Sequence, residues 1–96
     1  MTENERYLMM VEKLSQKHAA IALMIVNQKC GLVECSNAVQ QFLYFGKGCA
    51  YVCRCFGEIT GAQYHDLKNL ILDSVKQLNE LICRTILHED VSESGI

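Results

Sequence analysis

The sequence predicts an α+β domain, in which a small antiparallel sheet packs on helices in the order helix, strand, strand, short helix, strand, long helix. Three observations favour this class. Strong amphipathic helix patterns lie near both ends, two short apolar runs flank a polar segment with glycine, and a cysteine-rich run fits strand alternation. An all-α helical bundle is the alternative, because short apolar runs also occur in buried helices.

The first predicted helix spans about residues 3–18. Thr2 and Glu5 have the spacing of a capping box, in which each side chain bonds the backbone amide of the other residue. Apolar and aromatic side chains then recur at helical spacing, together with one histidine: Tyr7, Val11, Leu14 and His18.

A β-hairpin is predicted next. Ile21–Val26 is a short, wholly apolar run, 27–31 is polar and contains glycine, and Leu32–Cys35 is a second short run. A helix through the first run would be apolar all round, which favours a central strand. The alternative is that the first helix continues to about Lys29 and stops at Gly31.

A short helix, Ala38–Phe45, is predicted after a cap at Ser36 or Asn37, and the glycines of 46–48 are expected to end it. The run CAYVCRCF, 49–56, then reads as a strand. Alternation would place four side chains on one face of that strand: Cys49, Tyr51, Cys53 and Cys55.

The last helix is predicted from about residue 61 to 87, with a second capping box at Thr60 and Gln63. Its apolar stripe is wider than a small sheet covers, so we expect it also to form a homodimer interface. Arg54 would face a partner from the neighbouring strand. The expected interface residues of the helix are Tyr64, Leu67, Ile71, Val75, Leu78 and Ile82.

Length and composition set the remaining limits. The 96 residues form one domain, expected over 1–88, with a disordered acidic tail at 89–96. The net charge of −2 and the absence of a basic run disfavour nucleic-acid binding. The most apolar run, Ala19–Val26, is too short to span a membrane, and the acidic N-terminus does not resemble an export signal. A cytoplasmic location with reduced thiols is therefore expected.

Six cysteines raise the question of a metal site. The pairs Cys30/Cys35 and Cys49/Cys53 match zinc-ligand spacing only loosely, and Cys55 adds a third thiol to the second group. His65 and His88 are further donors, but both belong to the predicted last helix or its end. We favour the cysteines as small buried apolar side chains, and predict no cofactor, no metal and no enzymatic activity.

The segment MIVNQKCGLVECSNAVQQFL resembles the opening of a PAS sensor domain, in the variant that precedes some LuxR-type regulators. Met24–Val26 and Leu32–Val33 occupy the places of its first strands, with Gly31 in the turn. The pair Asn37–Ala38 and the apolar Phe42–Leu43 match the helix that follows. The resemblance implies a ligand pocket, but the last strands of that family have no counterpart in this chain.

The sequence thus predicts a small, non-enzymatic regulatory or interaction protein, a homodimer that inhibits or adapts a protein partner. The first alternative is a PAS-like small-molecule sensor, with a pocket formed by Phe42, Phe45, Tyr51 and Phe56. The second is a zinc-binding module that uses the cysteines.

Overall fold

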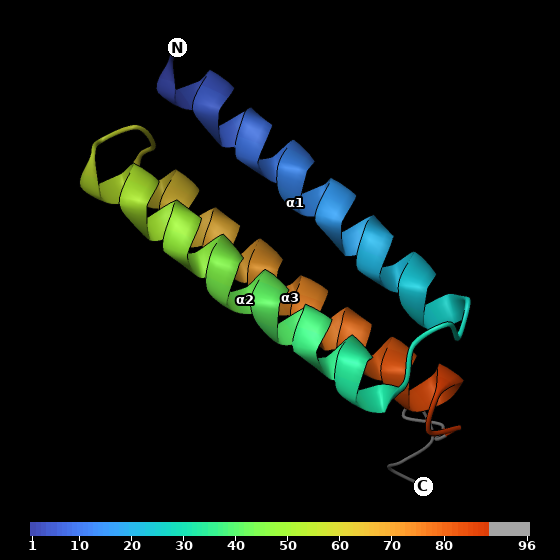
Figure 1. The fold of residues 1–96 in the computed structure, drawn as a ribbon. Helices are drawn as coiled ribbons and strands as arrows, with labels where there is room; N and C mark the ends of the chain where they lie inside the picture. Colours follow the sequence, from blue (N-terminus) through green and yellow to red (C-terminus); the bar gives the residue numbers. More distant parts are fainter. Residues whose placement is uncertain (89–96) are drawn as a thin grey trace, which may run out of the picture.

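The computed structural model describes residues 1–88 and consists of three long helices. They are α1 (Glu3–Val26), α2 (Leu32–Cys55) and α3 (Gly61–Thr85). Short loops join them, so that neighbours in sequence run antiparallel, with α2 beside α3 and α1 lying along the pair (Figure 1). Since residues 1–88 contain no strand, the predicted α+β class is wrong and the alternative, an all-α bundle, is correct.

Both predicted capping boxes are present. The backbone amide of Glu5 donates to Thr2 Oγ1 over 3.1 Å, at the start of α1. At the start of α3, the amides of Gln63 and Thr60 each donate to the other residue's side-chain oxygen over 3.0 Å. Two of the three helix starts were therefore readable from local sequence, because a capping box satisfies orphan amides without any tertiary contact.

The predicted first strand of the hairpin, 21–26, is the last part of α1. Ile25 is fully buried, whereas Leu23 is 61% and Val26 55% exposed. The all-apolar segment is therefore helical without being buried on every side, because it leaves large apolar side chains in solvent. The chain reverses at Gln28, which has a positive φ of 54° and whose side-chain amide donates to the Thr85 carbonyl over 3.3 Å.

The second hairpin strand, the short helix and the cysteine-rich strand are all parts of α2. Gly31 is its N-cap residue rather than a hairpin turn, and Ser36 and Asn37 lie inside the helix instead of capping it. The helix also continues through the glycines of 46–48 to Cys55. Each helical glycine costs about 1 kcal/mol relative to alanine, so α2 depends on packing against its neighbours.

Gly46 is where that packing is tightest. A Cβ atom at this position would lie 3.0 Å from Ile71 Cδ1 of α3 and 3.2 Å from Leu14 Cδ2 of α1. All three helices therefore converge on this glycine. At Gly48, by contrast, a Cβ atom would meet nothing within 4 Å. The two glycines that looked like equivalent helix breakers have different roles.

The core has two halves along the bundle. Near the first loop, Ile25 and Val39 pack with Leu78. Toward the other end, Leu14 and Phe42 pack with buried residues that include Ala50, Ile59, Leu67 and Ile71. The second loop is fixed by Ile59, which is fully buried, after Gly57 turns the chain with a φ of 70°.

Within residues 1–88 the three helices share two core clusters, both with residues from all three helices, while the domain boundary at residue 88 stays a prediction. The last helix lies at the predicted place, ending at Thr85 with Ile86 as its cap. The tail expected at 89–96 lies outside the described residues.

Candidate functional site

The stripe of α3 that was expected to reach a partner is mostly internal. Leu67 and Ile71 are fully buried by α1 and α2, and Leu78 and Ile82 are at most 4% exposed. Tyr64 and Val75, the remaining two, are half-buried against the same core. Because a third helix covers the stripe instead of a small sheet, no wide apolar face of α3 is left over.

Arg54 is exposed on α2, and its guanidinium lies over the start of α3. Its Nε and Nη2 atoms are each 3.7 Å from where a Cβ atom of Gly61 would be. The positive charge thus lies near the C-terminal end of α2, where the helix dipole favours it. This position gives Arg54 a role in the bundle itself, apart from any partner.

The cysteines are unpaired and scattered. Within residues 1–88, none forms a disulfide, and no three metal-binding side chains cluster closely enough to hold an ion. Cys35 is fully buried, and burial raises the pKa of its thiol. Cys49 and Cys53 are half-buried on one face of α2, and Cys55 is exposed on another, as helical geometry requires.

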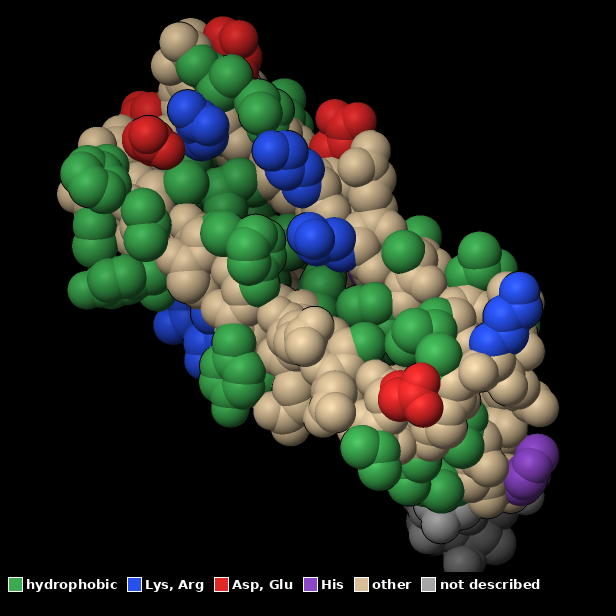
Figure 2. All heavy atoms as spheres, viewed as in Figure 1, with side chains coloured by type: hydrophobic (Ala, Val, Ile, Leu, Met, Phe, Trp, Pro, Cys, Tyr) green, Lys and Arg blue, Asp and Glu red, His purple; other side chains and the backbone are tan. Residues whose placement is uncertain are grey.

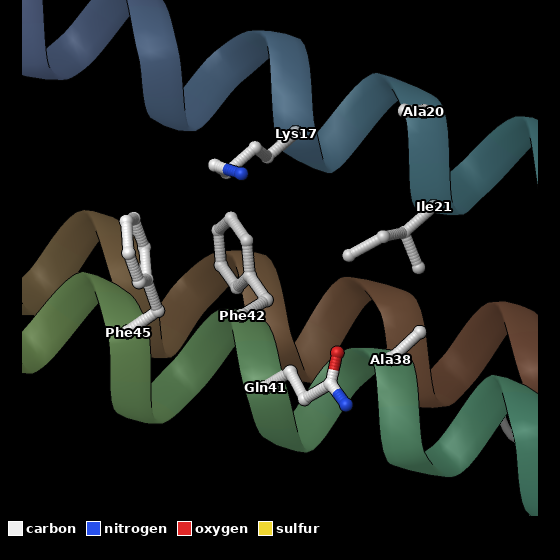
Figure 3. Close-up of a pocket in the computed structure, with 7 residues that line it drawn as sticks. All are labelled: Lys17, Ala20, Ile21, Ala38, Gln41, Phe42 and Phe45. Carbon is white, nitrogen blue, oxygen red and sulfur yellow. The ribbon is translucent and has the colours of Figure 1, made fainter.

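A groove lies between α1 and α2, on the side of these helices away from α3. It holds two cavities of about 350 Å³ each, lined only by residues of α1 and α2. We define the groove face by five of the lining residues, together with Val52, which lines an adjoining hollow on α2 with Phe45 and Cys49. The five are Met9, Lys13, Lys17, Phe45 and Cys49. Figure 3 shows Lys17 reaching from α1 toward the rings of Phe42 and Phe45, with Ile21 on the same side of the groove.

Large apolar side chains stand in solvent beside this groove. Along the C-terminal half of α2, Phe45 is 58% exposed, Val52 50% and Phe56 79%. Two tyrosines, Tyr44 at 67% and Tyr51 at 60%, extend the exposed aromatic surface around the helix. Figure 2 shows hydrophobic side chains gathered over this part of α2. Between Glu34 and Glu58, the sequence carries only two charged residues, Lys47 and Arg54.

The charges that line the groove are all positive. Arg6, Lys13 and Lys17 line it from α1, and no Asp or Glu is among the lining residues. Arg6 is engaged by Glu58, with 3.4 Å between Nε and Oε2. The Lys17 Nζ atom lies 5.1 Å from the centre of the Phe45 ring, a cation–π contact. Figure 2 shows basic side chains in a row on this face, next to the hydrophobic ones.

A smaller cavity of about 280 Å³ lies between α1 and α3. Its lining includes His18, Asp73, Ser74 and Gln77. The Nε2 atom of His18 is buried and has no hydrogen-bond partner within the described part of the chain. Within residues 1–88, no hydrogen bond joins this histidine to the serine or the aspartate of the cavity.

Comparison with known proteins adds no further identification: no family model, no curated protein and no solved structure matches this chain. Across residues 1–88, no helix is both long and apolar enough to cross a bilayer.

Sequence reasoning named Phe45 as a pocket residue but missed the groove. Lys13 and Lys17 were visible one turn apart on a predicted helix, yet their place beside Phe45 and Val52 depends on α2 being one helix. The sequence feature that could have indicated the groove face is the composition of α2. A stretch of 23 residues, 35–57, holds four exposed aromatic residues and only two charges, which is unusual for a helix with a solvent-facing side.

Proposed function

We propose that this chain is a non-enzymatic interaction module that binds and regulates a protein partner through the groove face. One observation carries the proposal. Phe45, Val52 and Phe56 are large apolar side chains held in solvent along one side of α2, while the core beneath them is already filled. Contiguous exposed apolar surface of this kind is typical of protein-binding sites.

The chemistry of the surface supports the same conclusion. Aromatic residues and methionine are enriched at protein interfaces, because they bury much area with few polar groups. The groove face combines Phe45 with Met9, a flexible thioether that adapts to an incoming surface. Basic side chains at its edge supply a polar rim, which favours correct orientation of a partner.

The partner is a different protein rather than a second copy. The homodimer was expected because the stripe of α3 seemed too wide for its own chain to cover, and that reason is gone now that α1 and α2 cover it. A symmetric pairing of two groove faces would put the positive charges of both copies into one interface whose lining has no carboxylate. Like charges in an interface are unfavourable.

The two alternative functions have weaker support. A small-molecule sensor needs a pocket that encloses its ligand, whereas the groove lies open at Phe45, which is 58% exposed. A zinc module needs a cluster of ligands, which the described residues do not form.

The test is site-specific photocrosslinking in the cells that express the chain. Phe45→p-benzoylphenylalanine places the crosslinker in the groove, and Leu72→p-benzoylphenylalanine is the matched control on α3, since Leu72 is 49% exposed. We expect a covalent adduct with one other protein at position 45 and none at 72. With that protein purified, Val52→Asp should weaken binding at least tenfold, and Leu72→Asp should not.

Two results would overturn the proposal. Equal adducts at positions 45 and 72 would indicate non-specific stickiness of exposed apolar residues. An adduct with the mass of two copies would indicate self-association through the groove instead of a separate partner.

A further inference from the structure

We propose that the partner segment is an acidic amphipathic helix that lies along the groove between α1 and α2. Its apolar side would cover Phe45, Cys49 and Val52, and its carboxylates would face Lys13 and Lys17. This inference rests on the proposed function and specifies the chemistry of the partner.

The shape of the groove suits a helix. It lies between two antiparallel helices of 24 residues each, and its lining comes from α1 and α2 alone. Because α3 packs on the other side of this pair, a further helix here would complete a four-helix arrangement. Amphipathic helices commonly bind apolar grooves in this way, with anchors at positions i, i+3 or i+4, and i+7.

The positive charges in the groove favour a partner with negatively charged side chains. Arg6, Lys13 and Lys17 follow one another at spacings of seven and four residues, which keeps them on one side of α1. At a rise of about 1.5 Å per residue they span about 16 Å. No lining residue carries a negative charge, and the carboxylate that reaches the lining, that of Glu58, is already paired with Arg6.

Lys13 and Lys17 contribute most to the preference for a negatively charged partner. Arg6 already has a carboxylate partner in Glu58, whereas residues 1–88 offer neither lysine an ion pair. Lys17 rests over the Phe45 ring, so one bound carboxylate would lie next to the main aromatic anchor. Placing the ion pair beside an apolar contact reduces its exposure to water and salt, which strengthens it.

Other occupants fit less well. A flat lipid surface would not fill a groove lined on both sides. A second copy offers carboxylates on the outer face of α3, at Asp66, Asp73 and Glu80, but the only exposed large hydrophobic residue on the described part of α3 is Leu72. An apolar stripe to match Phe45 and Val52 is missing from that face.

The experiment uses two synthetic peptides of 18 residues with the same leucine stripe, one with glutamates and one with lysines beside it. The protein is labelled with ¹³C at its methionine methyl groups, which gives four signals. We expect the acidic peptide to shift the signals of Met9 and Met10, which line the groove, and to leave Met1 unchanged. It should bind at least tenfold more tightly than the basic peptide in 50 mM salt, and the difference should shrink in 300 mM salt.

Variants with reversed charges test which residues cause the preference for the acidic peptide. The double variant Lys13→Glu/Lys17→Glu should lose at least tenfold in affinity for the acidic peptide and gain affinity for the basic one. The control, Lys29→Glu/Lys76→Glu, makes the same change in net charge at two exposed sites outside the groove lining. It should keep the preference for the acidic peptide.

Several outcomes would contradict the inference, and they are distinguishable from failure of the proposed function. Equal binding of both peptides at Met9 and Met10 would leave the groove as a docking site and remove the selection for acidic partners. No shift at these methyl groups with either peptide would exclude a helix in the groove, while the crosslinking result would stand by itself. Shifts produced only by phosphatidylserine vesicles would identify a lipid surface as the occupant.

Discussion

Replacing Gly46 by alanine tests how closely the three helices meet. The added methyl group would lie 3.0 Å from Ile71 Cδ1 and 3.2 Å from Leu14 Cδ2. Carbon atoms in favourable contact are about 3.5–4.0 Å apart, so both neighbours must move by about half an ångström. Inserting a methyl group into a packed core costs about 1–3 kcal/mol.

Gly48→Ala is the matched control, because both glycines lie inside α2 and a Cβ atom at 48 meets nothing within 4 Å. Each change gains about 1 kcal/mol from helix propensity. This gain cancels when the two variants are compared. We therefore expect Gly48→Ala to be stabilised by about 1 kcal/mol, and Gly46→Ala to be about 1–3 kcal/mol less stable than Gly48→Ala.

The assay is urea unfolding followed by far-UV circular dichroism, with reductant present to keep the cysteines free. Ile71→Val removes the Cδ1 atom that the new methyl group contacts. That change should be less costly in the Gly46→Ala background than in the wild type, by about 0.5 kcal/mol or more. Equal stabilisation by both glycine substitutions would refute the close approach of the helices at Gly46.

Three further predictions concern the core. Ile71→Asp should abolish the cooperative unfolding transition, since it places a charge at a fully buried position, and a normal transition would show that the face of α3 is misassigned. Burial raises the pKa of the Cys35 thiol above its ordinary 9.0, because burial disfavours the charged thiolate in the folded state. The stability that the protonated thiol contributes is therefore fully present below pH 9 and declines as the pH rises through the folded-state pKa. Cys35→Ala should therefore flatten the alkaline decline of the urea midpoint, and an unchanged decline would contradict this. His18→Leu should stabilise the fold by about 1 kcal/mol, because the buried Nε2 atom lacks a partner. A loss of stability would instead indicate that water in the neighbouring cavity satisfies the imidazole.

Local signals predicted α3 and the first part of α1, and failed on the end of α1 and on α2, for a physical reason. Both capping boxes and the stripe of α3 are properties of one segment, and they needed no knowledge of the rest of the chain. The helicity of α2 is decided by tertiary contacts at Gly46, Ala50 and Cys35, where small side chains allow close packing. Glycine is unfavourable in an isolated helix and useful at a close crossing, and only the structure distinguishes these cases.

The cysteine-rich stretch was ambiguous in the same way. Alternation at positions 49, 51, 53 and 55 fits a strand, but the spacing of Cys49 and Cys53 also fits one face of a helix. The helix assignment changes which residues become neighbours. Cys49 joins Phe45 and Val52 at the groove, while Cys55 turns away from it. The candidate site could therefore not be assembled before α2 was known to be continuous.

The distribution of side-chain size in α2 argues that its exposed face serves a purpose beyond folding. Three of the five buried residues of α2 are small (Cys35, Gly46 and Ala50) and the other two are Val39 and Phe42, whereas Phe45, Val52 and Phe56 are exposed. A helix arranged for stability alone would bury its largest apolar side chains, because each contributes about 1.5–3 kcal/mol when it leaves water. The small residues let α2 approach α1 and α3 closely, and the large ones remain free to be buried by something else. Since Lys13 and Lys17 border the same surface from α1, the arrangement favours a partner that supplies both apolar area and negative charge.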